Sequence, residues 1–271
     1  DFARKAQLVN YDQYRALIEG FSAHIWDWYT GVIIWKTQNP WTALRGQMYD
    51  YYLDPNAGLY GLHKGGEPLH VMYDPVKGMV DIVNNTFREQ RNLMLQVKLI
   101  NMRGESRSAG QVFEYINPSS VKSYLPIGRT VGHFTGKEGG FLLLRLMDTE
   151  KNILSENFYW LPDSTGNYSG LEHMANAELK ITARYNGKGH ITVAMSNPEN
   201  NPVAFFNRVS LVDASTKERL LPVFYSDNYI SVMPGESRAI DVDYSSLKNN
   251  SAIEIAVNGW NTPLQYLSIA P

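Results

Sequence analysis

The feature that most constrains this chain is a change of sequence periodicity near residue 64. Beyond that point, short segments of alternating apolar and polar residues are bounded by Gly, Pro, Asn and Asp, and no long helical pattern recurs. Alternation with a period of two is typical of strands that bury one face. The larger part of the chain is therefore expected to be β-structure.

The first set of expected strands precedes residue 162. In the stretch RNLMLQVKLI, the leucines and Val97 alternate with Gln96 and Lys98, as in a half-buried strand. The same pattern predicts further strands at 67–73, 78–84, 110–116, 141–147 and 153–160.

A second set follows residues 161–175, which are rich in turn formers and are interpreted as a linker or long crossing loop. Seven short segments of this set are expected to be strands, at 177–185, 190–197, 203–214, 220–226, 228–233, 238–244 and 252–260. Seven short strands in about 100 residues is the size of an immunoglobulin-like sandwich. The sequence thus predicts a mainly β protein with two tandem Ig-like β-sandwiches, at 64–162 and 163–271.

Residues 1–63 have a different character. Asn10 and Gln13 match a capping box that would start a helix near Tyr11. Residues 32–35, a continuous apolar run, are expected to form a strand covered on both faces. Apolar side chains at spacings of three and four share one helix face: Tyr11, Tyr14, Ile18, Phe21, Ile25 and Trp28.

Composition excludes several classes of protein. The formal net charge of −2 and pI near 6.3 provide no basic field for nucleic acid. No apolar run approaches the roughly 20 residues of a membrane span, so no membrane partner is expected. There is no cysteine, which excludes disulfides and thiolate chemistry. The N-terminal residues show no signal-peptide core, so the protein is either cytoplasmic or continues upstream.

Motifs for catalysis are missing from the sequence. The six histidines never have the spacing of a helical zinc site, so no metal is expected, and no phosphate loop or serine elbow predicts a cofactor or nucleophile. A glycosidase needs two opposed carboxylates, but the loop after residues 32–35 has none before Asp50. Asp12 and Glu19 are interpreted as solvated helix charges.

Two interpretations are open for the aromatic residues. Trp35 and Trp41 either face a sugar ring at the end of a strand or serve as core and interdomain packing, the commoner role of aromatics. Tyr225, Tyr229 and Trp260 form either a carbohydrate platform or part of a sandwich core. If these aromatic residues serve as core or interdomain packing, they have no direct role in binding sugar.

The segment GVIIWKTQNPWTALRGQMYDYYLDPNAGLYG resembles the end of the catalytic barrel in glycoside hydrolase family two, closest to the exo-β-D-glucosaminidase and mannosylglycoprotein endo-β-mannosidase branch. DQYRALIEG looks like the penultimate barrel helix of that family. The likeness continues, in order, through EPLHVMYD, NFYWLP, LPVFYSDNYISVMPGES and VNGWNTP, which resemble its C-terminal Ig-like domains.

The resemblance implies a retaining β-glycosidase whose acid/base and nucleophile glutamates lie upstream of Asp1, with residues 1–63 as the end of its (β/α)₈ barrel. It places Trp35 at the floor of the sugar subsite, with Asn39 and Trp41 beside it. The chain alone is expected to be inactive. The implied partner is a β-linked oligosaccharide or glycan, and a periplasmic or secreted location is favoured for a bacterial parent.

One structural consequence follows from the expected helix. Each large apolar side chain left in water forgoes roughly 1.5–3 kcal/mol, so a helix with such a face does not stay solvated. Residues 1–63 are therefore expected to fold back on the first sandwich, to bind the missing barrel or a second copy, or to be poorly ordered.

Overall fold

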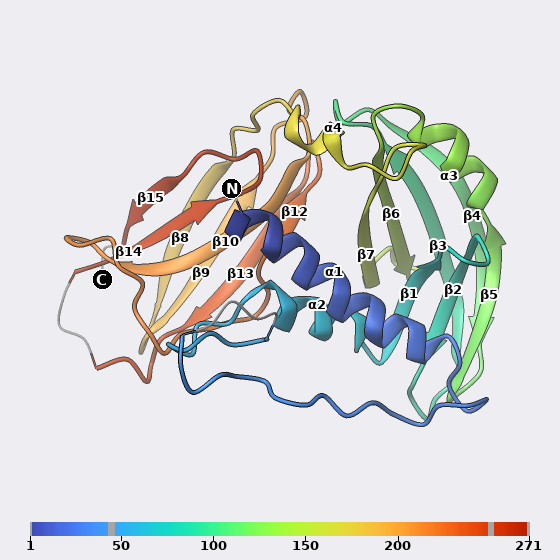
Figure 1. The fold of residues 1–271 in the computed structure, drawn as a ribbon, viewed down its shortest axis with the longest axis horizontal. Helices are drawn as coiled ribbons and strands as arrows, with labels where there is room; N and C mark the ends of the chain where they lie inside the picture. Colours follow the sequence, from blue (N-terminus) through green and yellow to red (C-terminus); the bar gives the residue numbers. More distant parts are fainter. Residues whose placement is uncertain (1, 43–46, 249–251, 270–271) are drawn as a thin grey trace. The chain divides into compact units, whose positions relative to one another are not determined.

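The computed structural model describes residues 2–42, 47–248 and 252–269. Antiparallel β-strands are the commonest regular structure of the chain, which divides into two compact units (Figure 1). The first sandwich unit comprises residues Asp12–Trp35 and Gly61–Met174. The second sandwich unit comprises Asp1–Tyr11, Lys36–Tyr60 and Ala175–Pro271. Each unit is therefore described by itself.

The first sandwich unit contains two antiparallel sheets. One has the strand order β1-β2-β5 and the other the order β4-β3-β6-β7. The strands are β1 (Leu69–Asp74), β2 (Met79–Asn84), β3 (Gln90–Ile100), β4 (Ser106–Ile116), β5 (Ser120–Pro126), β6 (Gly140–Met147) and β7 (Ile153–Leu161).

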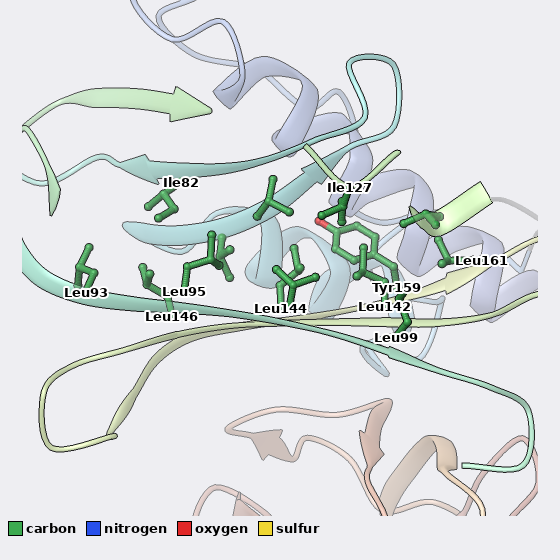
Figure 2. Packing of buried hydrophobic residues seen from close by; sticks show 14 of the residues in the cluster. Ile82, Leu93, Leu95, Leu99, Ile127, Leu142, Leu144, Leu146, Tyr159 and Leu161 are labelled. Atoms are coloured by element: carbon green, nitrogen blue, oxygen red, sulfur yellow. The ribbon is translucent and has the colours of Figure 1, made fainter. Parts of the chain in front are cut away.

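The core of the first sandwich unit lies between these two sheets. Figure 2 shows leucines of β3 and β6, among them Leu95 and Leu144, pointing toward Ile82 of β2. All three side chains are fully buried. Buried apolar residues occupy every second position of β3, at Leu93, Leu95, Val97 and Leu99, so one side of that strand supplies an unbroken apolar surface. The alternation read from the sequence is the cause of this packing.

The second sandwich unit repeats the arrangement with the strand orders β11-β13-β9-β8 and β12-β10-β14-β15. Its core joins both sheets through residues such as Val193 of β9, Leu211 of β10 and Ile255 of β14. The strands are β8 (Lys180–Gly187), β9 (His190–Ser196), β10 (Ala204–Asp213), β11 (Phe224–Tyr225), β12 (Ile230–Val232), β13 (Ser237–Asp243), β14 (Ile253–Asn258) and β15 (Gln265–Ser268).

These observations confirm the predicted fold class of a mainly β protein with Ig-like sandwiches. The sequence analysis missed β5 and β15, because their apolar residues are few and partly exposed. It also missed the short helices α3 (Gly128–Thr135) and α4 (Ser169–Glu172), the second of which lies in the expected loop at 161–175.

The two remaining helices are α1 (Phe2–Ser22) and α2 (Ala57–Gly65). Helix α1 begins eight or nine residues before the predicted start at Tyr11, and Asn10 is a buried interior residue, so the predicted capping box is wrong. Residues 2–9 include Ala, Arg, Lys, Gln and Leu, which favour helix without a cap at Asn10. The helix also ends before Ile25 and Trp28 of the predicted apolar face.

Residues 32–35 differ from the sequence expectation. They form no strand within the described part of the chain, and Ile33 is 93% exposed. A strand of a parallel sheet is covered on both faces by neighbouring elements, and no described strand pairs with this run. The apolar run therefore lies at the surface in a segment without regular structure that follows α1.

Candidate functional site

Helix α1 contributes charged side chains to the interior of the first sandwich unit. Glu19 is only 8% exposed and Arg15 only 1% exposed. The prediction that Glu19 is a solvated helix charge is therefore wrong, whereas Asp12 keeps nearly half of its side-chain surface in water. Of the three outcomes expected for residues 1–63, the structure shows folding back onto the first sandwich for the part of α1 that includes Arg15 and Glu19.

A buried polar cluster receives this helix. We call it the His70 cluster, and it consists of Glu19, Glu67, His70, Asn157 and Tyr159. Nε2 of His70 lies 3.0 Å from Oε1 of Glu19, and Nδ1 of His70 lies 3.3 Å from Oε2 of Glu67. Glu19 Oε1 also accepts from Asn157 Nδ2 at 2.6 Å and from the Tyr159 hydroxyl at 2.9 Å. One carboxylate thus joins α1 to β1 and β7.

The electrostatics of the His70 cluster favour its charged forms. Burial opposes ionisation of Glu19, but the hydrogen bond from His70 and the positive charges of Arg15 and His70 lower its pKa. Burial opposes protonation of His70, yet hydrogen bonds to Glu19 and Glu67 raise its pKa. Burial raises the pKa of Tyr159 well above its usual value, so this hydroxyl remains a donor. The charges compensate one another inside the unit.

Arg15 adds a second layer to the same attachment. Its guanidinium donates to Asn157 Oδ1 at 3.2 Å and to the carbonyl of Phe158 at 2.6 Å, and it pairs with Asp12 at 2.5 Å. It also lies over the ring of Tyr159, 4.1 Å from the centroid. Such a planar cation satisfies several acceptors at fixed angles, so it defines the orientation of the helix as well as its position.

In the second sandwich unit, a turn is held by arginines of the β-structure. Asp50 Oδ1 accepts from the backbone nitrogens of Tyr52 at 2.8 Å and Asp54 at 3.0 Å, which shapes the sequence DYYLD into a turn. The buried Asp54 then accepts from Arg208 Nη2 at 2.7 Å and pairs with Arg219. We call residues 50–54 the Asp54 turn. Two fixed cations neutralise its buried carboxylate.

Amides complete the attachments within the second sandwich unit. Asn10 Nδ2 of α1 donates to Asn56 Oδ1 at 3.0 Å, and Gln7 Oε1 accepts from the backbone nitrogen of Ala57 at 2.8 Å. Arg4 donates to the Trp260 carbonyl at 3.0 Å and stacks 4.2 Å from its ring centroid. The first part of α1 is thus held by hydrogen bonds and stacking.

The three residues predicted to face sugar are placed differently. Trp35, in the first sandwich unit, is 85% exposed. In the second sandwich unit, Trp41 is 59% exposed, whereas Asn39 is buried. The tryptophans therefore do not serve as core residues of either unit in this structure. Trp26 and Trp28, which precede Trp35, are also more than half exposed.

The alternative platform of Tyr225, Tyr229 and Trp260 does not form. Tyr229 and Trp260 are buried, and the ring of Tyr229 packs at a tilt of 47° against that of Phe206, with ring centroids 5.1 Å apart. Burial raises the pKa of Tyr229 to about 12. The Tyr225 hydroxyl accepts from the backbone nitrogen of Leu211 at 2.9 Å. These residues are core, which corrects the platform hypothesis.

The His70 cluster was not predicted from sequence patterns. Glu19 and Arg15 read as surface charges of an amphipathic helix, and His70 lies in a strand without any histidine partner nearby in sequence. A usable signal was present in Asn157 and Ser155, polar residues at the inward positions of β7. Buried polar side chains require hydrogen-bond partners. Ser155 and Asn157 therefore indicate that another segment supplies polar side chains to that face of β7.

The described residues contain no group of three or more carboxylates and histidines that could hold a metal ion. Among them there is also no helix long and apolar enough to cross a membrane. Glu19 and Glu67 both face His70, and both already accept hydrogen bonds from other side chains. They do not form the opposed pair that glycoside hydrolysis requires.

Comparison with known proteins gives the relationship. Residues 157–262 match the family model for the exo-β-D-glucosaminidase Ig-fold domain. The chain is 32% identical to the mannosylglycoprotein endo-β-mannosidase of Lilium longiflorum, over 99% of this chain and 34% of that protein. It is 32% identical to the exo-β-D-glucosaminidase of Streptomyces avermitilis, over 100% of this chain and 33% of that protein.

Solved structures agree. The crystal structure of the Amycolatopsis orientalis exo-chitosanase has a TM-score of 0.85 at 27% identity, and the match covers 99% of this chain and 35% of that one. The β-D-mannosidase of Dictyoglomus thermophilum shares the fold, with a TM-score of 0.69 at 17% identity over 95% of this chain and 29% of that one. The chain spans about a third of the length of these relatives. Over nearly its whole length the chain is therefore similar to the Ig-like part of glycosidases of the exo-β-D-glucosaminidase and mannosylglycoprotein endo-β-mannosidase type, and residues 157–262 match the Ig-fold domain of the former.

Proposed function

We propose that this chain is the supporting, non-catalytic part of a retaining β-glycosidase of the β-mannosidase or exo-β-glucosaminidase type. In this proposal residues 1–63 belong to the catalytic barrel, residues 64–162 and 163–271 are the supporting sandwiches, and the catalytic glutamates lie on the barrel. The observation that supports it best is the buried attachment of Glu19 and Arg15 of α1 in the first sandwich unit. Buried charged contacts of this kind hold α1 firmly on the sandwich, as expected if the sandwich supports the end of the barrel.

The same proposal gives the exposed tryptophans a role. Trp35 and Trp41 present large apolar rings to solvent, and such rings pack well against the apolar faces of sugars. We assign Trp35 to the floor of the sugar subsite and Asn39 and Trp41 to the loop beside it. The substrate is a β-linked oligosaccharide or glycan, which fits the names of the relatives.

The first test is the activity of the purified chain. Aryl β-mannosides and aryl β-glucosaminides are expected to show no turnover above the uncatalysed rate, because no opposed carboxylate pair is present among the described residues. A measurable turnover by chain free of contaminating enzyme would refute the proposal. Titration with manno-, chitosan- and N-glycan-derived oligosaccharides is the companion measurement. A support is expected to show no saturable binding at millimolar sugar, whereas saturation would favour a carbohydrate-binding module.

A second test concerns Trp35 in the complete enzyme. Substitution Trp35→Ala is expected to lower kcat/KM at least about tenfold, since burying a large apolar side chain is worth roughly 1.5–3 kcal/mol. The matched control is Trp26→Ala, which removes another exposed tryptophan of the first sandwich unit. Equal losses from both substitutions would remove Trp35 from the subsite.

A further inference from the structure

The two ring nitrogens of His70 face carboxylate oxygens on opposite sides. Nε2 lies 3.0 Å from Glu19 and Nδ1 lies 3.3 Å from Glu67, and His70 itself is 1% exposed. An ionised carboxylate only accepts hydrogen bonds, and a neutral imidazole has only one N–H to donate. Both contacts are therefore favourable together only when both nitrogens are protonated. The geometry alone selects the imidazolium form.

The surrounding charges stabilise the imidazolium form of His70 inside the unit. Helix α1 presents Glu19 and Arg15 to the cluster, and Arg15 is paired with Asp12. From the other side, Lys64 of α2 lies 2.6 Å from Glu67. Three positive groups then balance three carboxylates, with His70 as one of the three. Loss of the His70 proton leaves one buried negative charge in excess.

The uncharged neighbours of His70 donate chiefly to its two carboxylate partners. Strand β7 contributes Asn157, 3.3 Å from Nε2, and Tyr159, whose hydroxyl donates to Glu19. Ser155 of the same strand donates to Glu67 at 2.9 Å. All three groups donate to the carboxylates, and Asn157 Nδ2, the donor that also lies near Nε2, is closer to Glu19 Oε1 at 2.6 Å. A neutral Nδ1 that faces Glu67 therefore meets a second acceptor.

We propose that the His70 cluster is a proton-dependent clasp, in which the imidazolium of His70 holds the C-terminal half of α1 on β1 and β7 and releases it when the proton is lost. Because residues 23–35 follow α1 directly, release frees the segment that carries Trp35 from its anchor. The importance of that segment for sugar binding rests on the proposed function, but the clasp itself does not.

The direction of the pH dependence follows from the shifts. Burial disfavours the charged His70, but its two carboxylate partners raise the pKa above the ordinary 6.5. Its contribution to stability is then complete below about 6.5 and is lost as the pH rises through the folded-state pKa. Burial works against ionised Glu19 and Glu67 too, yet their partners lower each pKa below the ordinary 4.5, so their contribution is lost only in acid. The clasp is strongest between about pH 4.5 and 6.5.

The direct test is a proton NMR titration of the whole chain from pH 5 to 9. The Cε1–H resonance of His70 is assigned by its absence in the variant His70→Gln. It is expected to remain at the imidazolium position at pH 7.5, where an ordinary histidine is roughly nine-tenths neutral. A His70 that is neutral at pH 7 overturns the proposal, and this measurement needs only the unmodified protein.

Hydrogen exchange of the backbone amides tests the release. After correction for the intrinsic pH dependence of exchange, the amides of residues 15–22 are expected to lose at least about tenfold of their protection as His70 deprotonates. Amides of β6 serve as the reference and are expected to keep theirs. If the protection of residues 15–22 does not change across the titration of His70, the cluster is a static contact and the clasp is refuted.

A matched pair of variants separates specific charge from general stability. Glu67→Gln removes one carboxylate facing His70 and is expected to lower the titration midpoint of His70 by about 1 pH unit or more. Glu156→Gln removes a carboxylate of the same unit that pairs with Arg145 and lies between Ser155 and Asn157, on the other face of β7. The midpoint is expected to stay unchanged. Equal shifts in both variants would contradict the assignment.

Discussion

The His70 cluster and the Asp54 turn solve the same problem with different chemistry. Each brings a segment of residues 1–63 onto a β-sandwich through a buried carboxylate, Glu19 in one case and Asp54 in the other. The partner of Glu19 is a histidine, whereas the partners of Asp54 are Arg208 and Arg219. Arginine stays protonated at all accessible pH, but histidine does not.

This difference shows which attachment depends on pH and which does not. In the first sandwich unit, holding α1 depends on a proton that solution conditions remove. In the second, the turn that follows Trp41 is fixed by cations that do not titrate. Buried charges alone do not make a contact sensitive to pH, because the sensitivity depends on which cation is present. The predictions below are arranged by the size of their expected effect.

The largest effect is expected for Glu19→Ala. Removal of this carboxylate leaves the buried His70 without its nearer anion, and breaking a buried ion pair in this way typically costs about 3–5 kcal/mol. The free energy of unfolding from urea denaturation at pH 6 is the measurement. Glu89→Ala, which removes a carboxylate of the same unit from its ion pair with the exposed Arg91, is the control and is expected to cost about 1 kcal/mol or less. Equal costs would mean that burial of Glu19 has no energetic importance.

A smaller and pH-independent effect is expected for Asp54→Ala. The substitution removes hydrogen bonds to two arginines, and a hydrogen bond to a charged group is worth about 1.5–3 kcal/mol. Since Arg219 is partly solvated, the loss is expected at the lower end of that range. Urea denaturation at pH 6 and pH 9 is expected to give the same cost at both values. If the cost of Asp54→Ala instead halves at pH 9, the Asp54 turn depends on pH as the His70 cluster does, and the contrast between the two attachments is wrong.

Strand periodicity was enough to predict most of the β-structure. Leu95 and Leu144 lie in runs where alternation and apolar character agree, so their burial followed directly from the pattern. Strand β5 was not predicted, because a lysine, two serines and a terminal proline interrupt its apolar residues. The start of α1 was misplaced because Asn10 looks like a cap while its side chain in fact bonds to Asn56. Local signals fail where a distant residue supplies the partner.

The attachment sites were harder to foresee for the same reason. A glutamate in an amphipathic helix is usually solvated, and nothing near Glu19 in the sequence indicates His70, which is 51 residues away. The likeness of residues 31–61 to a barrel end pointed to Trp35, Asn39 and Trp41, and their role in sugar binding stays a prediction. Local periodicity does not show where long-range ion pairs form.

The smallest effect, and the sharpest separation of packing from charge, is expected at Gly65. This last residue of α2 lies against α1, and a Cβ added there would stand 3.0 Å from the Arg15 carbonyl oxygen and 3.1 Å from Ile18 Cβ. Gly65→Ala is therefore expected to push the helices apart and to cost about 1 kcal/mol. Because the change is steric, the cost measured by urea denaturation is expected to be the same at pH 6 and pH 9.

Gly20→Ala is the matched control, since a Cβ at Gly20 of α1 would meet nothing within 4 Å. Alanine is the better helix former, so this variant is expected to gain up to about 1 kcal/mol. The two substitutions add the same methyl group to neighbouring helices, and opposite signs would show that the helices are in close contact at Gly65. If both variants are stabilised, α1 and α2 are not packed at this point, and the C-terminal half of α1 is attached to the first sandwich unit through the His70 cluster and Arg15.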